Sequence, residues 1–246
     1  MRKIPICLKL LLVIMFLFYA IGHMTKPAFI PETKILSFSR YIWLVKNNEA
    51  RVGPGPNYFS NSNENAWVDE QGSLHLKITK RNNKWYCVEL ISEKSFGYGK
   101  YVFYLESKID QLNEKVVIGL FVLDESPKYN HHEIDIELSR WGWPINNNAQ
   151  FVIQPYTNSK NIYRFNIQQN SECATYSFEW KNKNIFFQSL DSNKIIQSWN
   201  YTGKNIPTPH DEKTRINFWL FKGNPPSDNE EVEIIIKKFE FIPQNK

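Results

Sequence analysis

The sequence contains few cysteines, shows little helical periodicity and carries a small net charge. Each of these features excludes some fold classes or some binding partners. Only three of its 246 residues are cysteines, and two of them, Cys87 and Cys173, lie beyond the N-terminal segment. At most one disulfide can form there, and the sequence leaves its formation open. After residue 22 no segment keeps a helical hydrophobic period over three turns, and no tandem repeat is present. These features argue against a helical or repeat fold.

The first 22 residues have the composition of a targeting signal. Three basic residues, Arg2, Lys3 and Lys9, precede an apolar run from Leu10 to Gly22. This run is short for a membrane-spanning helix and has the length of a signal-peptide core. We therefore expect a secreted, extracytoplasmic protein that begins near residue 23, with an uncleaved membrane anchor as the alternative. Residues 23–40 contain two prolines and are expected to form a linker.

Without the first 22 residues the chain is close to neutral. Its 30 basic side chains fall to 27 against 25 acidic ones, so the formal net charge drops from +5 to +2. No stripe of Lys and Arg remains that would indicate a nucleic-acid partner. Contact with a membrane is expected only through the N-terminal segment, if that segment is not cleaved.

The rest of the chain has the pattern of short strands. Residues 73–79, 100–106 and 175–180 alternate in the manner of half-buried strands, and clusters of Asn, Gly, Pro and Ser separate such runs. Near the C-terminus two alternating runs are out of phase, which predicts a β-bulge at Lys237–Lys238. The pattern predicts one all-β domain, a two-sheet sandwich over residues 41–246.

The most informative stretch is residues 131–138, His-His-Glu-Ile-Asp-Ile-Glu-Leu. Its period of two predicts a strand with Glu133, Asp135 and Glu137 on one face and apolar residues on the other. Like charges in a row repel, so the pattern indicates function rather than stability. On a concave strand the two glutamates can bring their carboxyls to about 5–6 Å, the separation found in retaining glycosidases. Asp135 can bond a neighbour, and a carboxyl flanked by carboxylates has the raised pKa that suits a general acid.

Two other interpretations of this stretch stay open. It can be a solvated strand face with no catalytic function. It can also be a metal site, since His131 and the three acids all carry ligand atoms, although four residues along one strand span too long a line to surround a single ion. We predict neither a metal nor another cofactor.

The segment Glu-Ile-Asp-Ile-Glu resembles the active-site strand of glycoside hydrolase family 16. This resemblance implies a jelly-roll β-sandwich of the concanavalin A-like lectin and glucanase type, which cleaves or transfers β-glucans and related polysaccharides with retention. It implies Glu133 as nucleophile, Asp135 as its helper and Glu137 as general acid/base. The motif lacks an extra residue before its last Glu, as in the lichenase and xyloglucan-transferase branches. His131 also resembles the plant xyloglucan enzymes.

Further runs resemble the family in the same order along the chain. Residues 53–59 resemble a loop that supplies Asn57 to the glycone side of the cleft. The run Asn217-Phe218-Trp219 resembles a strand whose Asn and Trp face the sugar beside the nucleophile. Read by itself, this strand is apolar on both faces and therefore central, with Trp219 as a platform for a sugar ring.

Gln150 and Gln154 lie on the next apparent strand, where their amides can donate to sugar hydroxyls or to Glu133. Together these features predict a secreted retaining glycoside hydrolase or transglycosylase. We expect it to be endo-acting and monomeric, with a β-linked polysaccharide, most naturally a β-glucan, as its partner. The alternative is a non-catalytic carbohydrate-binding sandwich, since this fold also serves lectins. A pure binder, however, has no need of three acids in register.

Overall fold

The computed structural model describes residues 33–129 and 132–244, which form sixteen strands and four short 3₁₀ helices. The predicted signal, residues 1–22, lies outside the described residues, as does His131. None of the helices in the described part has the length and hydropathy needed to cross a membrane.

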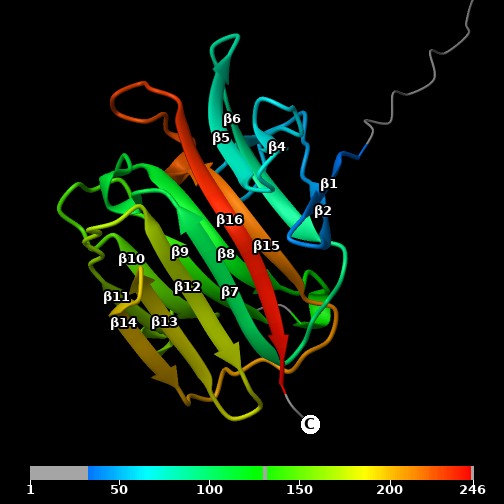
Figure 1. Cartoon of the computed structure of the whole chain (residues 1–246), viewed down its shortest axis with the longest axis vertical. Coiled ribbons are helices and arrows are strands. Elements are labelled where there is room, and N and C mark those ends of the chain that lie inside the picture. The colour runs from blue at the N-terminus through cyan, green and yellow to red at the C-terminus, as the bar shows by residue number, and fades with distance from the viewer. Residues whose placement is uncertain (1–32, 130–131, 245–246) are drawn as a thin grey trace, which may run out of the picture. The chain divides into compact units, whose positions relative to one another are not determined.

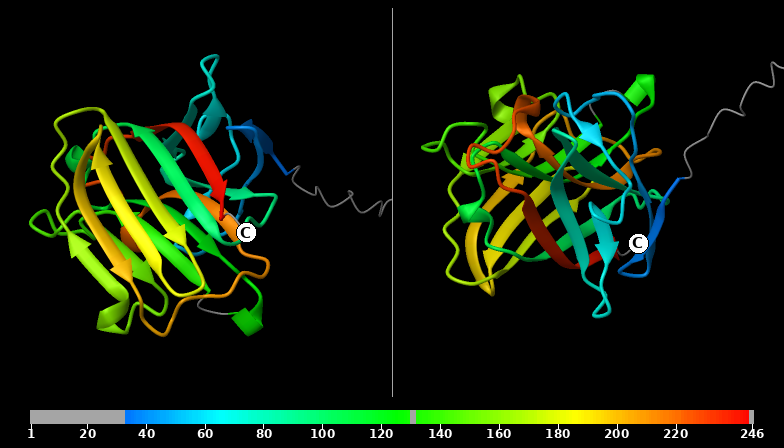
Figure 2. Two further views of the ribbon diagram at one scale, coloured as in Figure 1. Left: turned by 60° about the horizontal axis from the view of Figure 1, so that its bottom comes forward. Right: turned by 90° about the horizontal axis from the view of Figure 1, so that it is seen from above.

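The strands form two layers packed face to face (Figures 1 and 2). The first layer has the order β11-β10-β9-β8-β15-β6, with β2 and β1 beside β6. The second has the order β5-β16-β7-β12-β13-β14, with β4 beside β5. The hairpin of β5 and β6 joins the layers, and neighbouring strands are antiparallel except that β3 runs parallel to β6. This arrangement confirms the predicted all-β sandwich.

The first layer consists of β1 (Ile35–Phe38), β2 (Tyr41–Val45), β6 (Lys84–Ser92), β8 (Val116–Leu123), β9 (Glu133–Leu138), β10 (Ala149–Ile153), β11 (Ile162–Phe165) and β15 (Lys213–Leu220). The second consists of β4 (Ala66–Val68), β5 (Leu74–Arg81), β7 (Gly99–Glu106), β12 (Cys173–Trp180), β13 (Ile185–Asp191), β14 (Lys194–Tyr201) and β16 (Val232–Pro243). The short strand β3 spans Tyr58–Phe59, and the 3₁₀ helices are η1 (Ile109–Gln111), η2 (Pro127–Tyr129), η3 (Ser159–Asn161) and η4 (Phe221–Gly223).

The layers are held together by aromatic and aliphatic side chains that point inward from both. Alternation along each strand places every second residue in this core. Phe151 of β10 stacks on Phe187 of β13 across the two layers, with ring centroids 4.9 Å apart. Within the second layer, Tyr101 of β7 stacks on Phe178 of the neighbouring strand β12. Each such pair adds about 0.5–1.5 kcal/mol beyond the burial of its area. The core fixes the register of the first layer, whose opposite face carries the site.

The predicted bulge in the last strand is confirmed. The pairing register of β16 shifts between Ile236 and Lys238. β16 pairs with β5 along one edge from Val232 to Ile236, and with β7 along the other edge from Ile236 to Pro243. The extra residue therefore keeps the apolar side chains on both sides of the shift, Ile234, Ile236 and Phe239, on the core face.

The folded unit begins earlier than predicted, at Thr33. The strand β1 lies within the segment expected to be a linker and pairs with β2 through a turn at Ser39 and Arg40, both of which have positive φ. Phe38 is almost fully buried in the core. The linker boundary at residue 40 is therefore corrected. The alternation of four residues before the turn is too short to be recognised as a strand from its pattern alone.

The two cysteines whose pairing the sequence left open are both free. Cys87 is buried on β6 in the first layer, whereas Cys173 is exposed at the start of β12 in the second. No disulfide therefore contributes to the stability of the described part of the chain.

Candidate active site

The strand β9 presents the three predicted acids on one face. Its apolar residues, Ile134, Ile136 and Leu138, are buried in the core, and the period of two turns the acids to the opposite face of the sheet. β9 is paired on both sides, with β8 and with β10. The predicted strand is confirmed, and its acids are held by a central strand rather than by a mobile edge.

A row of facing residues crosses the sheet at Glu137. Cross-strand pairing joins, in order from β11 to β6, Arg164, Gln150, Glu137, Gly119, Asn217 and Glu89. Facing residues on neighbouring strands lie on the same side of a sheet. The row therefore brings together residues separated by up to 128 positions in the sequence, and it includes three of the predicted site residues.

Gly119 leaves room for the amide of Asn217. A Cβ atom at Gly119 would lie 2.3 Å from Asn217 Oδ1, which no real side chain permits. Asn217 is buried, and its Oδ1 has no hydrogen-bond partner among the described residues. A buried carbonyl oxygen without a donor is costly, by about 1–3 kcal/mol. This oxygen is therefore a natural acceptor for a ligand hydroxyl.

Glu137 lies where two parts of one cleft meet. A charged part of about 240 Å³ holds all three acids, and an aromatic part of about 400 Å³ lies on the other side of Glu137. The charged part is also lined by Lys46, Gly53, Pro54, Glu89, Gly119, Phe121, Leu123, Glu125, Arg215 and Asn217. The aromatic part is lined by Trp141, Gln150, Gln154, Tyr156, Ile162, Arg164, Trp219 and Phe221.

Burial raises the pKa of Asp135 well above its ordinary range, and the neighbouring Glu133 and Glu137 raise it further. Burial also raises the pKa of Glu133, but a hydrogen bond from Asp135 and the charge of Arg215 oppose that rise. The proton is therefore held on Asp135 and donated to Glu133. Gln154 Nε2 donates to Asp135 Oδ2 over 3.3 Å, which holds the Asp135 side chain in place.

Glu137 is the acid of the row that holds a proton near neutrality. Burial, together with the charge of Glu133, raises its pKa to about 7, against the opposing effects of Gln150 and Arg164. Gln150 Nε2 donates to Glu137 Oε2. Arg164 Nε donates to Gln150 Oε1 over 2.9 Å, and because guanidinium groups only donate, this contact fixes which end of the amide faces Glu137.

The charged part of the cleft contains a buried ion network that was not predicted from the sequence. Glu89 accepts from Arg215 over 2.7 Å and from Lys46 over 2.8 Å. Arg215 also contacts the exposed Glu125 over 2.9 Å. Arg215 and Glu89 are both almost fully buried. The signal for them is a charged residue in the interior of a central strand, Arg215 on β15 and Glu89 on β6, because such charges are rarely buried unless they are paired.

The family model described as "Glycosyl hydrolases family 16" matches residues 55–236, which include every strand of the row. The chain belongs to glycoside hydrolase family 16. Which branch of the family it resembles most stays a prediction. Among curated proteins, none matches the chain.

Solved structures with a similar fold agree with this architecture for the family 16 hydrolase. A Bacillus licheniformis β-glucanase has a TM-score of 0.64 at 19% identity and covers 87% of this chain and 100% of its own. A lichenase from a mouse hindgut metagenome has a TM-score of 0.59 at 18% identity over 82% of this chain and 93% of its own. A protein of Mycobacterium tuberculosis described as a pseudo β-1,3-glucanase has a TM-score of 0.63 at 15% identity, over 82% of this chain and 91% of its own.

The structure places most predicted substrate contacts of this hydrolase in the cleft. Gln150, Gln154, Asn217 and Trp219 line it. Asn57 does not, because its amide donates to the carbonyls of Pro54 and Leu220, each over 2.9 Å. It thereby ties the loop containing Gly53 and Pro54, which do line the cleft, to the end of β15. Substrate contact by these residues stays a prediction.

Two of the rings in the aromatic part contact each other. Trp141 follows β9 with a positive φ, and its ring lies 6.4 Å from the ring of Trp219. Trp143, two residues further on, is exposed. The turn after β9 therefore places one indole within the cleft and leaves the other in solvent.

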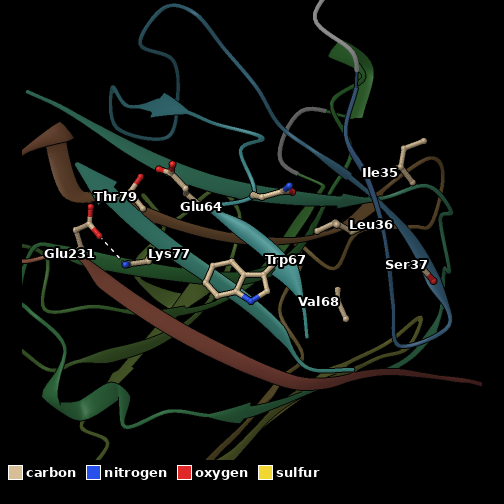
Figure 3. Close-up of a pocket in the computed structure, with 10 residues that line it drawn as sticks. Ile35, Leu36, Ser37, Glu64, Trp67, Val68, Lys77, Thr79 and Glu231 are labelled. Carbon is tan, nitrogen blue, oxygen red and sulfur yellow. Dashed lines mark ion pairs between the residues drawn. The ribbon is translucent and has the colours of Figure 1, made fainter. Parts of the chain in front are cut away.

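The hollow shown in Figure 3 is larger, about 840 Å³, but it lies away from the acids. It is lined by residues of β1, β4 and β5, together with Asn63 and Glu64 before β4 and Glu231 just before β16. Its Lys77 is paired with Glu231 over 2.9 Å, and Trp67 stacks on His75. Its two carboxyls, Glu231 and Glu64, are each ion-paired, with Lys77 and with Arg81. Three acids of one strand face line the smaller cleft at β9, which is therefore the candidate active site. Across the described residues, no group of three or more His, Cys, Asp or Glu could hold a metal ion.

Proposed function

We propose that this family 16 member is a retaining, endo-acting glycosidase of a β-linked polysaccharide, with a β-glucan as substrate. The observation that carries the proposal is the placement of three acids on one face of β9, where all three line the charged part of the cleft. Asp135 holds a proton and donates it to Glu133, while Glu137 has a pKa of about 7. One available carboxylate and one available acid on a single strand face are what a two-step displacement needs.

In the first step Glu133 attacks the anomeric carbon as Glu137 gives its proton to the glycosidic oxygen. The bond from the anomeric carbon to that oxygen breaks, the leaving sugar departs as an alcohol, and a glycosyl ester forms on Glu133. In the second step Glu137, now a carboxylate, takes a proton from the incoming hydroxyl. The oxygen of that hydroxyl displaces Glu133. Water gives hydrolysis, whereas a sugar hydroxyl gives transglycosylation.

Two features support a polymeric substrate. Glu137 is shared by both parts of the cleft, so a chain can extend past the reacting bond in each direction. The aromatic part offers Trp219 and Trp141, whose ring faces suit the C–H-rich faces of sugars. The β-glucanase and lichenase that share the fold favour a β-glucan among such polymers.

Chemical rescue of Glu133→Ala tests the mechanism. The variant should lose turnover, and azide should restore part of it by occupying the space left by the carboxylate. Because azide then attacks without a covalent enzyme intermediate, the glycosyl azide should have inverted configuration, which NMR of the product distinguishes. Ordinary activity of Glu133→Ala without azide would contradict the assignment.

The second candidate is a non-catalytic carbohydrate-binding sandwich, favoured by the pseudo β-1,3-glucanase that shares the fold. Intact protein on a panel of β-glucans separates the two. Cleavage, followed by product sizing, supports the enzyme and reports on transfer against hydrolysis. Retardation of the protein in a polysaccharide-containing gel without any cleavage supports the binder.

A further inference from the structure

Arg215 is a buried cation at the floor of the charged part of the cleft. It lies on β15 in register with Phe121 of β8, which faces Asp135 of β9. Nη1 of Arg215 contacts Glu89 over 2.7 Å and Nη2 contacts Glu125 over 2.9 Å. Its Nε is buried and has no hydrogen-bond partner among the described residues. The Nε–H, a donor on a guanidinium whose two terminal nitrogens each contact a carboxylate, is thus left for a ligand.

Most of the titratable side chains that face Glu133 are acidic. Asp135 and Glu137 share its strand, Glu89 is on β6 and Glu125 follows β8. Lys46 and Arg215 are the two cations that line this part of the cleft. Lys213 lies in the row of Glu133, but its ammonium contacts Asp211 and Ser95. The other polar groups near this end of β9 are His132, Gln154, and the ion pair of Asp124 with His210.

We propose that Arg215 is a positioning residue with two roles: it holds Glu133 as the attacking carboxylate, and its Nε–H binds an oxygen of the sugar that becomes attached to Glu133. This inference rests on the proposed function, in which Glu133 is the nucleophile.

The first role follows from charge and burial. The positive charge of Arg215 lowers the pKa of Glu133, whereas burial and Glu89 raise it. Arg215 is almost fully buried, so solvent screens this attraction little. Without Arg215, Glu133 would face Glu89 and Glu125 with only Lys46 to balance them. Glu133 would then retain its proton to higher pH and could not attack.

The second role follows from the unpartnered donor. Arg215 Nε and Asn217 Oδ1 are two residues apart on one strand face, and both lack a partner within the described part of the chain. A sugar that offers one oxygen as acceptor and one hydroxyl as donor satisfies both. The carboxylates of Glu89, Glu125 and Glu133 outnumber the two cations, so this sugar is uncharged rather than a uronic acid.

Two substitutions separate the roles. Arg215→Met keeps the length of the side chain but removes both charge and donor, whereas Arg215→Lys keeps the charge and loses the Nε donor. Arg81→Met is the matched control, because Arg81 is ion-paired with Glu64 and does not line the cleft. Circular dichroism and thermal unfolding check that each variant folds.

The first readout is the pH dependence of kcat/KM on the β-glucan that the wild type cleaves. In Arg215→Met the acid limb, set by Glu133, should move up by about one pH unit, a tenfold loss below the limb, while the basic limb, set by Glu137, stays in place. Arg215→Lys should keep the wild-type acid limb but raise KM by about threefold to tenfold, the cost of one hydrogen bond. Arg81→Met should match the wild type.

A uniform loss of activity with both limbs unmoved would overturn the electrostatic role, and an unchanged KM in Arg215→Lys would overturn the sugar contact. The second readout needs no substrate. Glutamate labelled with ¹³C at Cδ is titrated by NMR in wild type and Arg215→Met, and the Glu133 signal is assigned by its loss in Glu133→Gln. Its midpoint should rise in Arg215→Met. If no polysaccharide is cleaved, the proposed function fails, and this titration still decides whether Arg215 sets the charge of Glu133.

Discussion

Glu137→Gln should make the folded protein more stable above neutral pH while removing the proposed acid. A glutamate in an unfolded chain has a pKa of about 4.3, whereas burial beside Glu133 raises the pKa of Glu137 to about 7. The folded state therefore binds the proton more tightly than the unfolded state. The stabilisation from this group is complete below the unfolded pKa and is lost as the pH rises through 7. Glutamine keeps the size, stays uncharged and still offers an oxygen to Gln150.

The magnitude follows from the two pKa values. At about 1.4 kcal/mol per pH unit, ionisation of Glu137 lowers the free energy of unfolding by about 1 kcal/mol at pH 5 and about 3 kcal/mol at pH 8. Glu137 is only half-buried. Because solvent screens its charge, both free-energy changes are upper values. With a urea m-value of about 2–3 kcal/mol/M, the gain at pH 8 corresponds to an increase of about 1 M in the unfolding midpoint.

Urea unfolding at pH 5 and pH 8 measures this directly. The midpoint of Glu137→Gln should exceed that of the wild type by clearly more at pH 8 than at pH 5. Glu231→Gln is the matched control, because a hydrogen bond from Lys77 lowers the pKa of Glu231, and its substitution should bring no gain at either pH. An equal gain of Glu137→Gln at both pH values would refute the linkage, since a packing effect does not depend on the proton.

Two further substitutions test the floor of the cleft. Gly119→Ala should lower kcat/KM by more than tenfold with an unchanged circular dichroism spectrum, because its Cβ would displace the Asn217 amide; kinetics equal to wild type would show that this amide does not contact substrate. Trp219→Ala should raise KM about fivefold with little change in kcat, since stacking is worth about 1 kcal/mol, and an unchanged KM would remove Trp219 from the sugar site.

The fold was largely predictable because its information is local. Alternation along single strands identified β5, β7 and β12, and a phase slip identified the bulge in β16. The strand β1 was missed, since only its pairing with β2 and the burial of Phe38 in the core mark it as a strand. A segment of four residues is too short for burial of this kind to produce a recognisable alternating pattern in the sequence.

Periodicity alone predicted only the part of the candidate site whose residues share a strand. Gln150, Gln154, Asn217 and Trp219, which also line the cleft, were predicted with the help of the family resemblance. The three acids follow one another at a period of two, so their common face was evident. Arg164 and Glu89 lie at opposite ends of a row that crosses six strands, and no spacing in the sequence reports that pairing. Asn57 is a residue that was predicted in the site but does not line it. Its type suits a sugar contact, but the fold uses its amide to bind two backbone carbonyls.

The division of the cleft at Glu137 matches the two sugar positions that the proposed reaction requires, one for the sugar bonded to Glu133 and one for the leaving sugar. Glu133 lies in the charged part, so the sugar that becomes bonded to it must lie over Gly119 and Asn217. There the unpartnered Asn217 Oδ1 and Arg215 Nε can bind its hydroxyl groups. The leaving sugar then lies over the rings of the aromatic part, beside Glu137. Polar contacts hold the sugar that must stay, and stacking holds the sugar that must leave, because stacking constrains orientation less than buried hydrogen bonds do. An acid placed anywhere but at this junction could not reach the oxygen that joins the two sugars.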